Sequence, residues 1–203
     1  MNVAVIGASG NIGTKIVHEL VARGHSVTAI ARNAGKAPTG AKITAKAGDA
    51  ADVDATAALL KGHDAAISSA PFAPGLSPAI LAAVKKSGVK RYIMVGGAGS
   101  LEVAPGKMLK DTLSLPEPVM KILSEGTESL KRLRGETALD WTFFSPAAEI
   151  GPGERTGKFR LGGDQLVTDA AGKSRISYDD YAIALVDELE QGKHIKKRFT
   201  VAY

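Results

Sequence analysis

The stretch Gly7-Ala8-Ser9-Gly10-Asn11-Ile12-Gly13 decides the fold, because it stands between an apolar run and an amphipathic helix. The apolar run Val3–Ile6 is typical of a buried parallel strand. After the glycines, Ile12, Ile16 and Leu20 recur at every fourth position, as on one face of a helix. A strand, a glycine-rich turn and a helix in this order are typical of a turn that holds phosphate groups.

Each glycine of this turn has a physical task. Gly7 permits the sharp exit from the strand, Gly10 leaves no Cβ in the path of a pyrophosphate, and Gly13 lets the helix lie close to the sheet. The helix N-terminus offers free N–H groups and the positive end of its dipole to phosphates. We therefore expect a dinucleotide here; the alternative is a tight turn without a ligand. The expected cofactor contacts in the turn are Gly7, Ser9, Gly10, Asn11, Ile12 and Gly13.

Outward from the turn, strands and helices alternate along most of the chain. The expected strands cover residues 3–6, 26–31, 42–47, 65–68, 92–95, 140–144 and 199–202. The expected helices cover residues 12–23, 52–60, 78–86, 118–135 and 177–190. This alternation predicts an α/β fold: a Rossmann-type doubly wound parallel sheet in the strand order 3-2-1-4-5-6-7, with helices on both faces.

The 203 residues suit one domain, residues 1–203, with a small C-terminal lobe for a substrate. Residues 100–117 lack periodicity and are expected to form a long loop. Residues 146–176 are glycine-rich and mixed, and we expect one small hairpin within residues 166–176.

The end of the second expected strand indicates which dinucleotide binds. A site for NAD usually has Asp or Glu there, whereas this chain has Arg32 and Asn33 and no carboxylate. The planar guanidinium of Arg32 can pair with a 2′-phosphate, and Lys36 can add charge. We therefore predict that NADP(H) is preferred over NAD(H); the alternative is that Arg32 is a solvated loop residue.

Further cofactor contacts are expected where the third and fourth strands end. Asp49 can accept a hydrogen bond from the adenine amino group, or it can simply cap its loop. Ser68, Ser69 and Ala70 are small and leave room for the dinucleotide backbone, although a plain turn would also explain them.

Composition limits the other classes of function. With no cysteine, the chain can form no disulfide, thiolate nucleophile or zinc–thiolate site, and the four histidines lack metal-ligand spacing, so no metal site is expected. The net charge is +5, but basic residues are scattered among acids, and the run 193–198 is expected to be a solvated loop. A dinucleotide explains this charge as well as nucleic acid does.

Location and partners follow from the same features. No apolar run could span a bilayer, and no leader peptide precedes the first strand, so we expect a cytoplasmic protein. The expected partner is a small-molecule acceptor, with neither nucleic acid nor membrane, and the protein is expected to be a monomer or a homodimer.

Several motifs together resemble the atypical short-chain dehydrogenase/reductase superfamily. More narrowly, the chain is similar to NADH–flavin reductases, relatives of biliverdin IXβ/flavin reductase and of the NmrA-like proteins. The resemblance covers nearly the whole chain and implies the fold and the cofactor more specifically than the substrate. The motifs are the glycine turn, Arg32-Asn33, Gly48-Asp49, Val95–Val103, Ser145-Pro146-Ala147, Gly153–Gly157 and Arg175-Ile176-Ser177.

The chain departs from the superfamily in its catalytic acid. The usual Tyr-x-x-x-Lys pair lies on the helix after the fifth strand, but residues 107–123 contain no tyrosine. Reactions that move a proton at a hydroxyl group need such an acid or base. Flavin reduction needs less from the protein, because hydride goes to flavin N5 and a proton can come from water.

The resemblance therefore implies an NAD(P)H-dependent reductase of flavin (FMN, FAD or riboflavin) or a related conjugated acceptor. Flavin would be a substrate and not a bound prosthetic group. The alternative is a non-catalytic NADP(H)-binding redox sensor like the NmrA-like regulators, since the missing pair suits both.

The carboxyl ends of the fifth and sixth strands are expected to hold the reacting groups. Gly96, Gly97 and Pro146 are expected near the nicotinamide. Ala98, Gly99 and Arg155 are expected to contact the substrate, and Ser100 is the candidate catalytic residue. The plainer alternatives are a loop cap for Ser100 and an exposed loop residue for Arg155.

Overall fold

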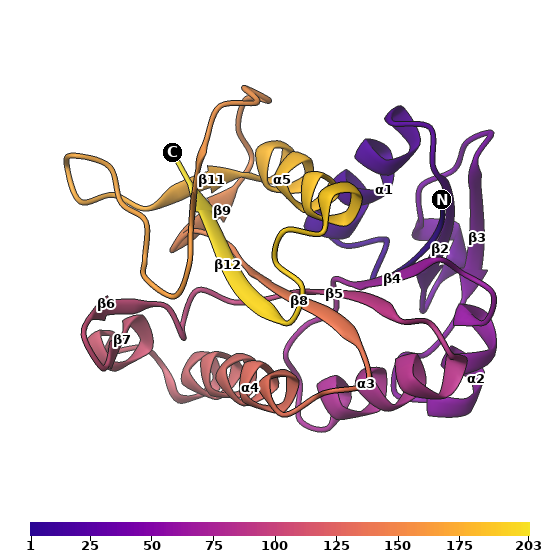
Figure 1. Cartoon of the computed structure of the whole chain (residues 1–203), viewed down its shortest axis with the longest axis horizontal. Helices are drawn as coiled ribbons and strands as arrows, with labels where there is room; N and C mark the ends of the chain where they lie inside the picture. Colours follow the sequence, from indigo (N-terminus) through magenta and orange to yellow (C-terminus); the bar gives the residue numbers. More distant parts are fainter.

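An eight-stranded sheet forms the middle of the molecule, with helices packed against both of its faces (Figure 1). The computed structural model describes residues 1–203. The strands of this sheet are β1 (Asn2–Ile6), β2 (Ser26–Ala31), β3 (Ile43–Ala47), β4 (Ala65–Ser68), β5 (Arg91–Val95), β8 (Asp140–Ser145), β10 (Arg160–Gly162) and β12 (Lys197–Ala202).

The strand order across the sheet is β10-β12-β8-β5-β4-β1-β2-β3. All neighbours pair in parallel except β10, which runs antiparallel to β12 at the edge. The seven parallel strands are the seven predicted ones, so the predicted order 3-2-1-4-5-6-7 is confirmed. The order reverses beside β1, so β1 and β4 diverge into the two halves of the sheet, and ligands of such sheets bind at this point.

Two apolar cores lie on the two faces of the sheet. Helices α1 and α5 cover one face, around Ile16, Leu20 and Tyr181, while α3 and α4 cover the other, around Ile80 and Leu130 (Figure 1). The helices are α1 (Asn11–Ala22), α2 (Val53–Leu60), α3 (Leu76–Ser87), α4 (Glu117–Arg134) and α5 (Tyr178–Gln191), with short 3-10 helices η1 (Ala34–Lys36) and η2 (Leu109–Thr112).

Local capping explains where two of these helices begin. The Asp52 side chain accepts hydrogen bonds from the N–H groups of Asp54 and Ala55 at the start of α2. The Ser177 hydroxyl accepts from the N–H of Asp180 at the start of α5. Both residues are typical N-caps, and the two predicted helices, residues 52–60 and 177–190, begin at them.

The segment after β5 is more ordered than the predicted loop over residues 100–117. It forms a small hairpin of β6 (Glu102–Ala104) and β7 (Lys107–Met108), followed by η2. Gly106, with φ 72°, makes the turn of this hairpin. The strands are too short and too exposed to show an alternating apolar pattern, which is why the sequence did not indicate them.

The hairpin predicted within residues 166–176 is wrong. Strand β11 (Arg175–Ser177) pairs in parallel with β9 (Glu149–Gly151), which lies far back along the chain. These two strands form a separate two-stranded sheet, whereas β10 belongs to the central sheet. A local pattern cannot reveal such a distant partner, because three-residue strands carry almost no periodicity.

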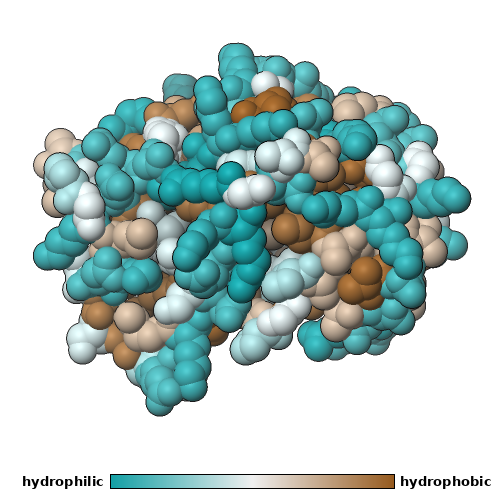
Figure 2. All heavy atoms as spheres, turned by 60° about the horizontal axis from the view of Figure 1, so that its bottom comes forward, coloured by the Kyte–Doolittle hydropathy of each residue, from teal (hydrophilic) through white to brown (hydrophobic).

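Most of the large apolar side chains that are exposed lie in one region of the chain. Figure 2 shows a largely hydrophilic face with apolar side chains lying between the polar ones. The exposed large apolar side chains on the segment from β6 into α4 are Val103, Leu113, Leu115, Val119 and Ile122. None of the helices combines the length and the apolar character needed to cross a membrane.

Candidate dinucleotide-binding site

The turn between β1 and α1 has the backbone geometry of an anion cradle. The N–H groups of Gly7 and Ala8 both donate to the Ile30 carbonyl, at 2.9 and 3.1 Å, which ties the turn to β2. Gly10 precedes α1 without a side-chain cap, and the first turn of α1 has no acidic residue. The first N–H groups of α1 are therefore left for an outside acceptor, and the positive end of the helix dipole favours an anion there.

The three glycines of the turn differ in whether the protein itself has space for a Cβ at their position. A Cβ at Gly7, whose φ is 80°, would overlap the Ser69 carbonyl, and a Cβ at Gly13 would overlap the Gly7 carbonyl. A Cβ at Gly10 would meet only the Gly7 carbonyl oxygen, at an ordinary 3.4 Å. The protein itself thus needs glycine at positions 7 and 13, whereas the open space at Gly10 suits a bound pyrophosphate.

A cavity of about 310 Å³ opens beside this turn, at the carboxyl ends of β1, β2, β3 and β4. We call it the glycine-turn cavity. Its position is the one at which open α/β sheets bind dinucleotides. Seven of the predicted cofactor residues line it: Gly7, Ser9, Gly10, Arg32, Asp49, Ser69 and Ala70. The remaining lining is largely apolar, from Ile6, Ile30, Ala31, Gly48, Ala50, Pro71, Ala73 and Leu76.

Arg32 and Asp49 are the two charged residues of this lining. The Arg32 side chain is exposed and lies in no ion pair, so its guanidinium is free to meet an anion. Asp49 uses one carboxylate oxygen to accept from the Ala51 N–H at 3.0 Å. Its second oxygen is left for a donor such as an adenine amino group.

Other predicted cofactor residues lie next to the cavity with their side chains otherwise engaged. The Asn33 side chain accepts from the Gly35 N–H and caps η1. The Ser68 hydroxyl is buried and forms a 2.7 Å hydrogen bond with the Tyr92 hydroxyl. Asn11 lines a separate hollow with Lys15 and Asp179, while Ile12 and Gly13 are turned toward the protein interior.

The predicted acceptor end lies on the segment that follows β5. Gly97 and Ala98 are partly exposed, whereas Gly96 and Gly99 are buried against Phe143 and Leu123. Pro146, after β8, is buried, and its carbonyl accepts from the Thr200 hydroxyl. Among these residues, only Gly97 and Ala98 are thus partly exposed, and we call them the floor of the acceptor end.

Ser100, the predicted catalytic residue, is 5% exposed. Its hydroxyl has no hydrogen-bond partner, and its carbonyl accepts from Arg198 at 3.3 Å. A buried hydroxyl without a partner carries a free-energy penalty. Ser100 is not among the residues that line the glycine-turn cavity, and its catalytic role stays a prediction.

Residues 7–191 match the family described as NAD(P)H-binding. The chain belongs to the NAD(P)H-binding family. That match begins at the glycine turn and runs to the end of α5, so it includes β2, β3 and β4 beside the cavity but neither β1 nor β12. Together with the similar structures described next, it agrees with the resemblance to the atypical short-chain dehydrogenases/reductases.

Three solved structures show how similar relatives have been described. A proposed exported protein from Burkholderia pseudomallei is 44% identical, with a TM-score of 0.89 and 100% of each chain covered. A proposed epimerase from Bacteroides thetaiotaomicron is 41% identical, with a TM-score of 0.95, over 100% of this chain and 96% of the other. A proposed NADH–flavin reductase from Streptococcus pneumoniae is 39% identical, with a TM-score of 0.83, over 100% and 99%.

Within this NAD(P)H-binding protein, Arg155 is bound in an ion pair. Its guanidinium donates to both carboxylate oxygens of Glu19, at 3.1 and 2.9 Å. The hydrogen bonds to Glu19 raise the pKa of Arg155 above its ordinary value. Arg23 also binds Glu19 and connects α1 to Asp187 on α5. The predicted substrate contact of Arg155 would require its guanidinium to leave or share Glu19.

Sequence reasoning missed two features near the site. Phe72, on the loop after β4, is partly exposed, and its ring lies 3.5 and 3.4 Å from the positions that a Cβ would take at Gly97 and Gly126. Asp180 is fully buried and accepts from the hydroxyls of Thr156 and Tyr203. Burial opposes ionisation of Asp180, but these bonds hold its pKa below the ordinary value. The position of Phe72 could have been suspected from the sequence, because Pro71-Phe72 follows a predicted strand that ends at the cofactor site.

Proposed function

We propose that this protein is an NADPH-dependent reductase that transfers hydride to a flavin or a related conjugated acceptor. The observation that carries the proposal is the open space at Gly10, beside an uncapped helix N-terminus and a free arginine. These features suit a pyrophosphate and a 2′-phosphate. The solved relative described as a proposed NADH–flavin reductase supports the choice of acceptor.

The preference for NADPH rests on Arg32. It is exposed at the end of β2 and lines the cavity, and the end of β2 carries no Asp or Glu that would bind ribose hydroxyls in its place. A guanidinium matches a phosphate dianion with two parallel hydrogen bonds. The 2′-phosphate of NADPH is the group that such a site would distinguish from the 2′-hydroxyl of NADH.

The positions of the tyrosines favour an acceptor whose reduction needs no proton donor from the protein. The hydroxyls of Tyr92 and Tyr181 are buried and bound to Ser68 and the Phe144 carbonyl, and burial raises the pKa of both tyrosines. The Tyr203 hydroxyl binds Asp180. Tyr178 is the remaining tyrosine, on the hollow beside Asn11. In the sequence, none of the four tyrosines is followed by a lysine four residues later.

The chain's own contribution would be orientation. NADPH supplies the hydride, that is, two electrons and one proton, to the acceptor. The glycine turn would hold the pyrophosphate, and the partly exposed floor at Gly97 and Ala98 would let a planar acceptor lie on the nicotinamide. Holding the two rings together removes most of the entropic barrier to the transfer.

The test is NADPH oxidation by the purified protein, followed by absorbance, with FMN, FAD, riboflavin and a quinone as acceptors. We expect saturable turnover with at least one flavin, and none with the matched Gly10→Val protein. NADPH binding without turnover on any acceptor would contradict the reductase and indicate a redox sensor. We further propose a cytoplasmic monomer or homodimer that acts on a small molecule, and cell fractionation and gel filtration would check these two points.

A further inference from the structure

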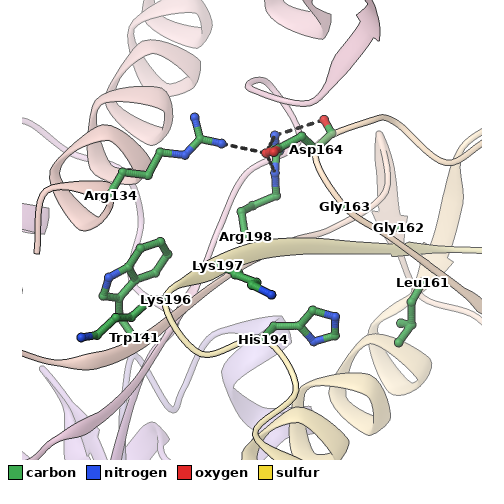
Figure 3. Close-up of a pocket in the computed structure, with 10 residues that line it drawn as sticks. All are labelled: Arg134, Trp141, Leu161, Gly162, Gly163, Asp164, His194, Lys196, Lys197 and Arg198. Atoms are coloured by element: carbon green, nitrogen blue, oxygen red, sulfur yellow. Dashed lines mark hydrogen bonds and ion pairs between the residues drawn. The ribbon is translucent and has the colours of Figure 1, made fainter. Parts of the chain in front are cut away.

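A second cavity lies at the amino ends of β8 and β12 (Figure 3). Its volume is about 550 Å³. We call it the basic cavity; its lining is Arg134, Trp141, Leu161, Gly162, Gly163, Asp164, His194, Lys196, Lys197 and Arg198. Strand β12 is separated from β1 by β8, β5 and β4, so the basic cavity lies about 19 Å across the sheet from the glycine turn.

The lining of the basic cavity carries a surplus of positive charge. Four of its side chains are cationic, Arg134, Lys196, Lys197 and Arg198, and one is a carboxylate, Asp164. His194 adds no carboxylate and binds Glu188, which lies outside the cavity, at 2.7 Å. A concave surface with three uncompensated positive charges attracts anions.

Arg198 is the unusual member of this set. Its side chain is 2% exposed, and its Nη1 has no hydrogen-bond partner. Its Nε and Nη2 bind the Asp164 carboxylate, and Nη2 also donates to the carbonyls of Ser100 and Asp164. A buried guanidinium that is only partly satisfied is destabilising unless an anion supplies further acceptors.

The carboxylate of Asp164 forms ion pairs with two arginines of the cavity. Figure 3 shows Arg134 and Arg198 reaching the same carboxylate from α4 and β12, and Arg134 Nη2 lies 2.7 Å from its Oδ1. The Asp164 side chain is 53% exposed, so it can turn out into solvent. Beside it, a Cβ at Gly163 would touch nothing within 4 Å, which leaves space at this wall.

We propose that the basic cavity binds a phosphate group, held by Arg134 and Arg198 in place of Asp164. A phosphate dianion brings more charge and more acceptor oxygens than the single carboxylate that both arginines now share. Neither the reductase reaction nor the glycine turn requires this site.

The test is calorimetric titration with inorganic phosphate and with glycerol phosphate, at constant ionic strength set by chloride. Saturating NADP⁺ is present, so that the glycine turn is filled. We expect saturable binding that weakens about tenfold or more in Arg134→Glu, because this change reverses a charge beside the anion. Lys61→Glu, an exposed lysine at the end of α2, is the matched control and should bind as the wild type does.

Asp164→Asn tests the same site in the opposite direction. Removal of the competing carboxylate should tighten phosphate binding about threefold or more, while loss of a merely structural contact would not. Tighter binding of glycerol phosphate than of phosphate would identify a phosphorylated metabolite as the ligand, and the reverse would identify free phosphate.

Three results would overturn the proposal. They are no binding in the presence of NADP⁺, equal binding by Arg134→Glu and Lys61→Glu, and weaker binding by Asp164→Asn. A single-stranded oligonucleotide that binds more tightly than either phosphate, with the same loss in Arg134→Glu, would indicate nucleic acid as the ligand in place of the small anion.

Discussion

The glycine-turn cavity and the basic cavity both suit anions, but they are built from different parts of the chain. The first consists of backbone N–H groups, glycines and small side chains, with Arg32 as its one cation. The second consists of long charged side chains contributed by α4, β12 and the segments before and after them. Backbone groups hold their positions without loss of side-chain entropy, whereas four long cations must be ordered by their surroundings.

This difference teaches how each site should respond to mutation. In the glycine-turn cavity the identity of a few glycines decides the shape, and charge adds selectivity. In the basic cavity the charges of the side chains are expected to determine whether an anion binds, and the glycines only leave space for it. The following predictions separate the two cases, beginning with the largest expected effect.

Gly10→Val should abolish dinucleotide binding, with a loss of about 100-fold or more in NADPH affinity. The valine methyls would fill the pyrophosphate path, yet the backbone at Gly10, φ −77° and ψ 164°, accepts any residue. Calorimetry with NADPH measures the loss, and thermal melting should show a folded protein. Gly13→Val is the contrasting control, because its side chain overlaps the Gly7 carbonyl and should lower the melting temperature. Unchanged NADPH affinity in folded Gly10→Val would refute the phosphate-turn assignment.

Arg32→Ala should weaken NADPH binding about tenfold to a hundredfold, because a charge-assisted contact with a phosphate contributes roughly 1.5–3 kcal/mol. NADH affinity should change little, since its ribose carries a neutral hydroxyl. Parallel titrations with both dinucleotides give the ratio, and Lys36→Ala, on η1 close to Arg32, is the control for a general loss of charge. Equal losses for NADPH and NADH would mean that Arg32 does not distinguish the 2′-phosphate.

Gly163→Ala should have the smallest effect. An added Cβ meets no atom within 4 Å, and Gly163 is absent from the glycines with positive φ. We expect the free energy of unfolding to stay within about 0.5 kcal/mol of the wild type, and phosphate binding to be unchanged. Chemical denaturation and phosphate titration measure both. A large loss of either would show that backbone shape matters in the basic cavity as it does at the glycine turn.

Much of the fold could be predicted because its signals are local. The apolar run before Gly7, the four-residue repeat of α1 and the caps Asp52 and Ser177 each act within one turn or one strand. The hairpin predicted within residues 166–176 failed for the opposite reason: β11 pairs with β9, and nothing local to either segment identifies the other.

The predicted site shows the same division. Residues of the glycine turn and Arg32 line one cavity, as the motif and the strand order require. Residues predicted beyond the motif, Ser68 and Arg155, are bound instead to Tyr92 and Glu19. Their partners are 24 and 136 positions away, and such pairing depends on how helices and strands pack.

The sequence by itself determined the glycine turn, the alternation of strands and helices, and hence the strand order and the place of the dinucleotide. These depend on backbone sterics and on periodicity, which neighbouring residues decide among themselves. Only the tertiary structure decided that Arg198, at the end of a basic run expected to be solvated, would be buried between Asp164 and the Ser100 carbonyl. The environment of a charged side chain depends on distant segments that meet only when the sheet is complete.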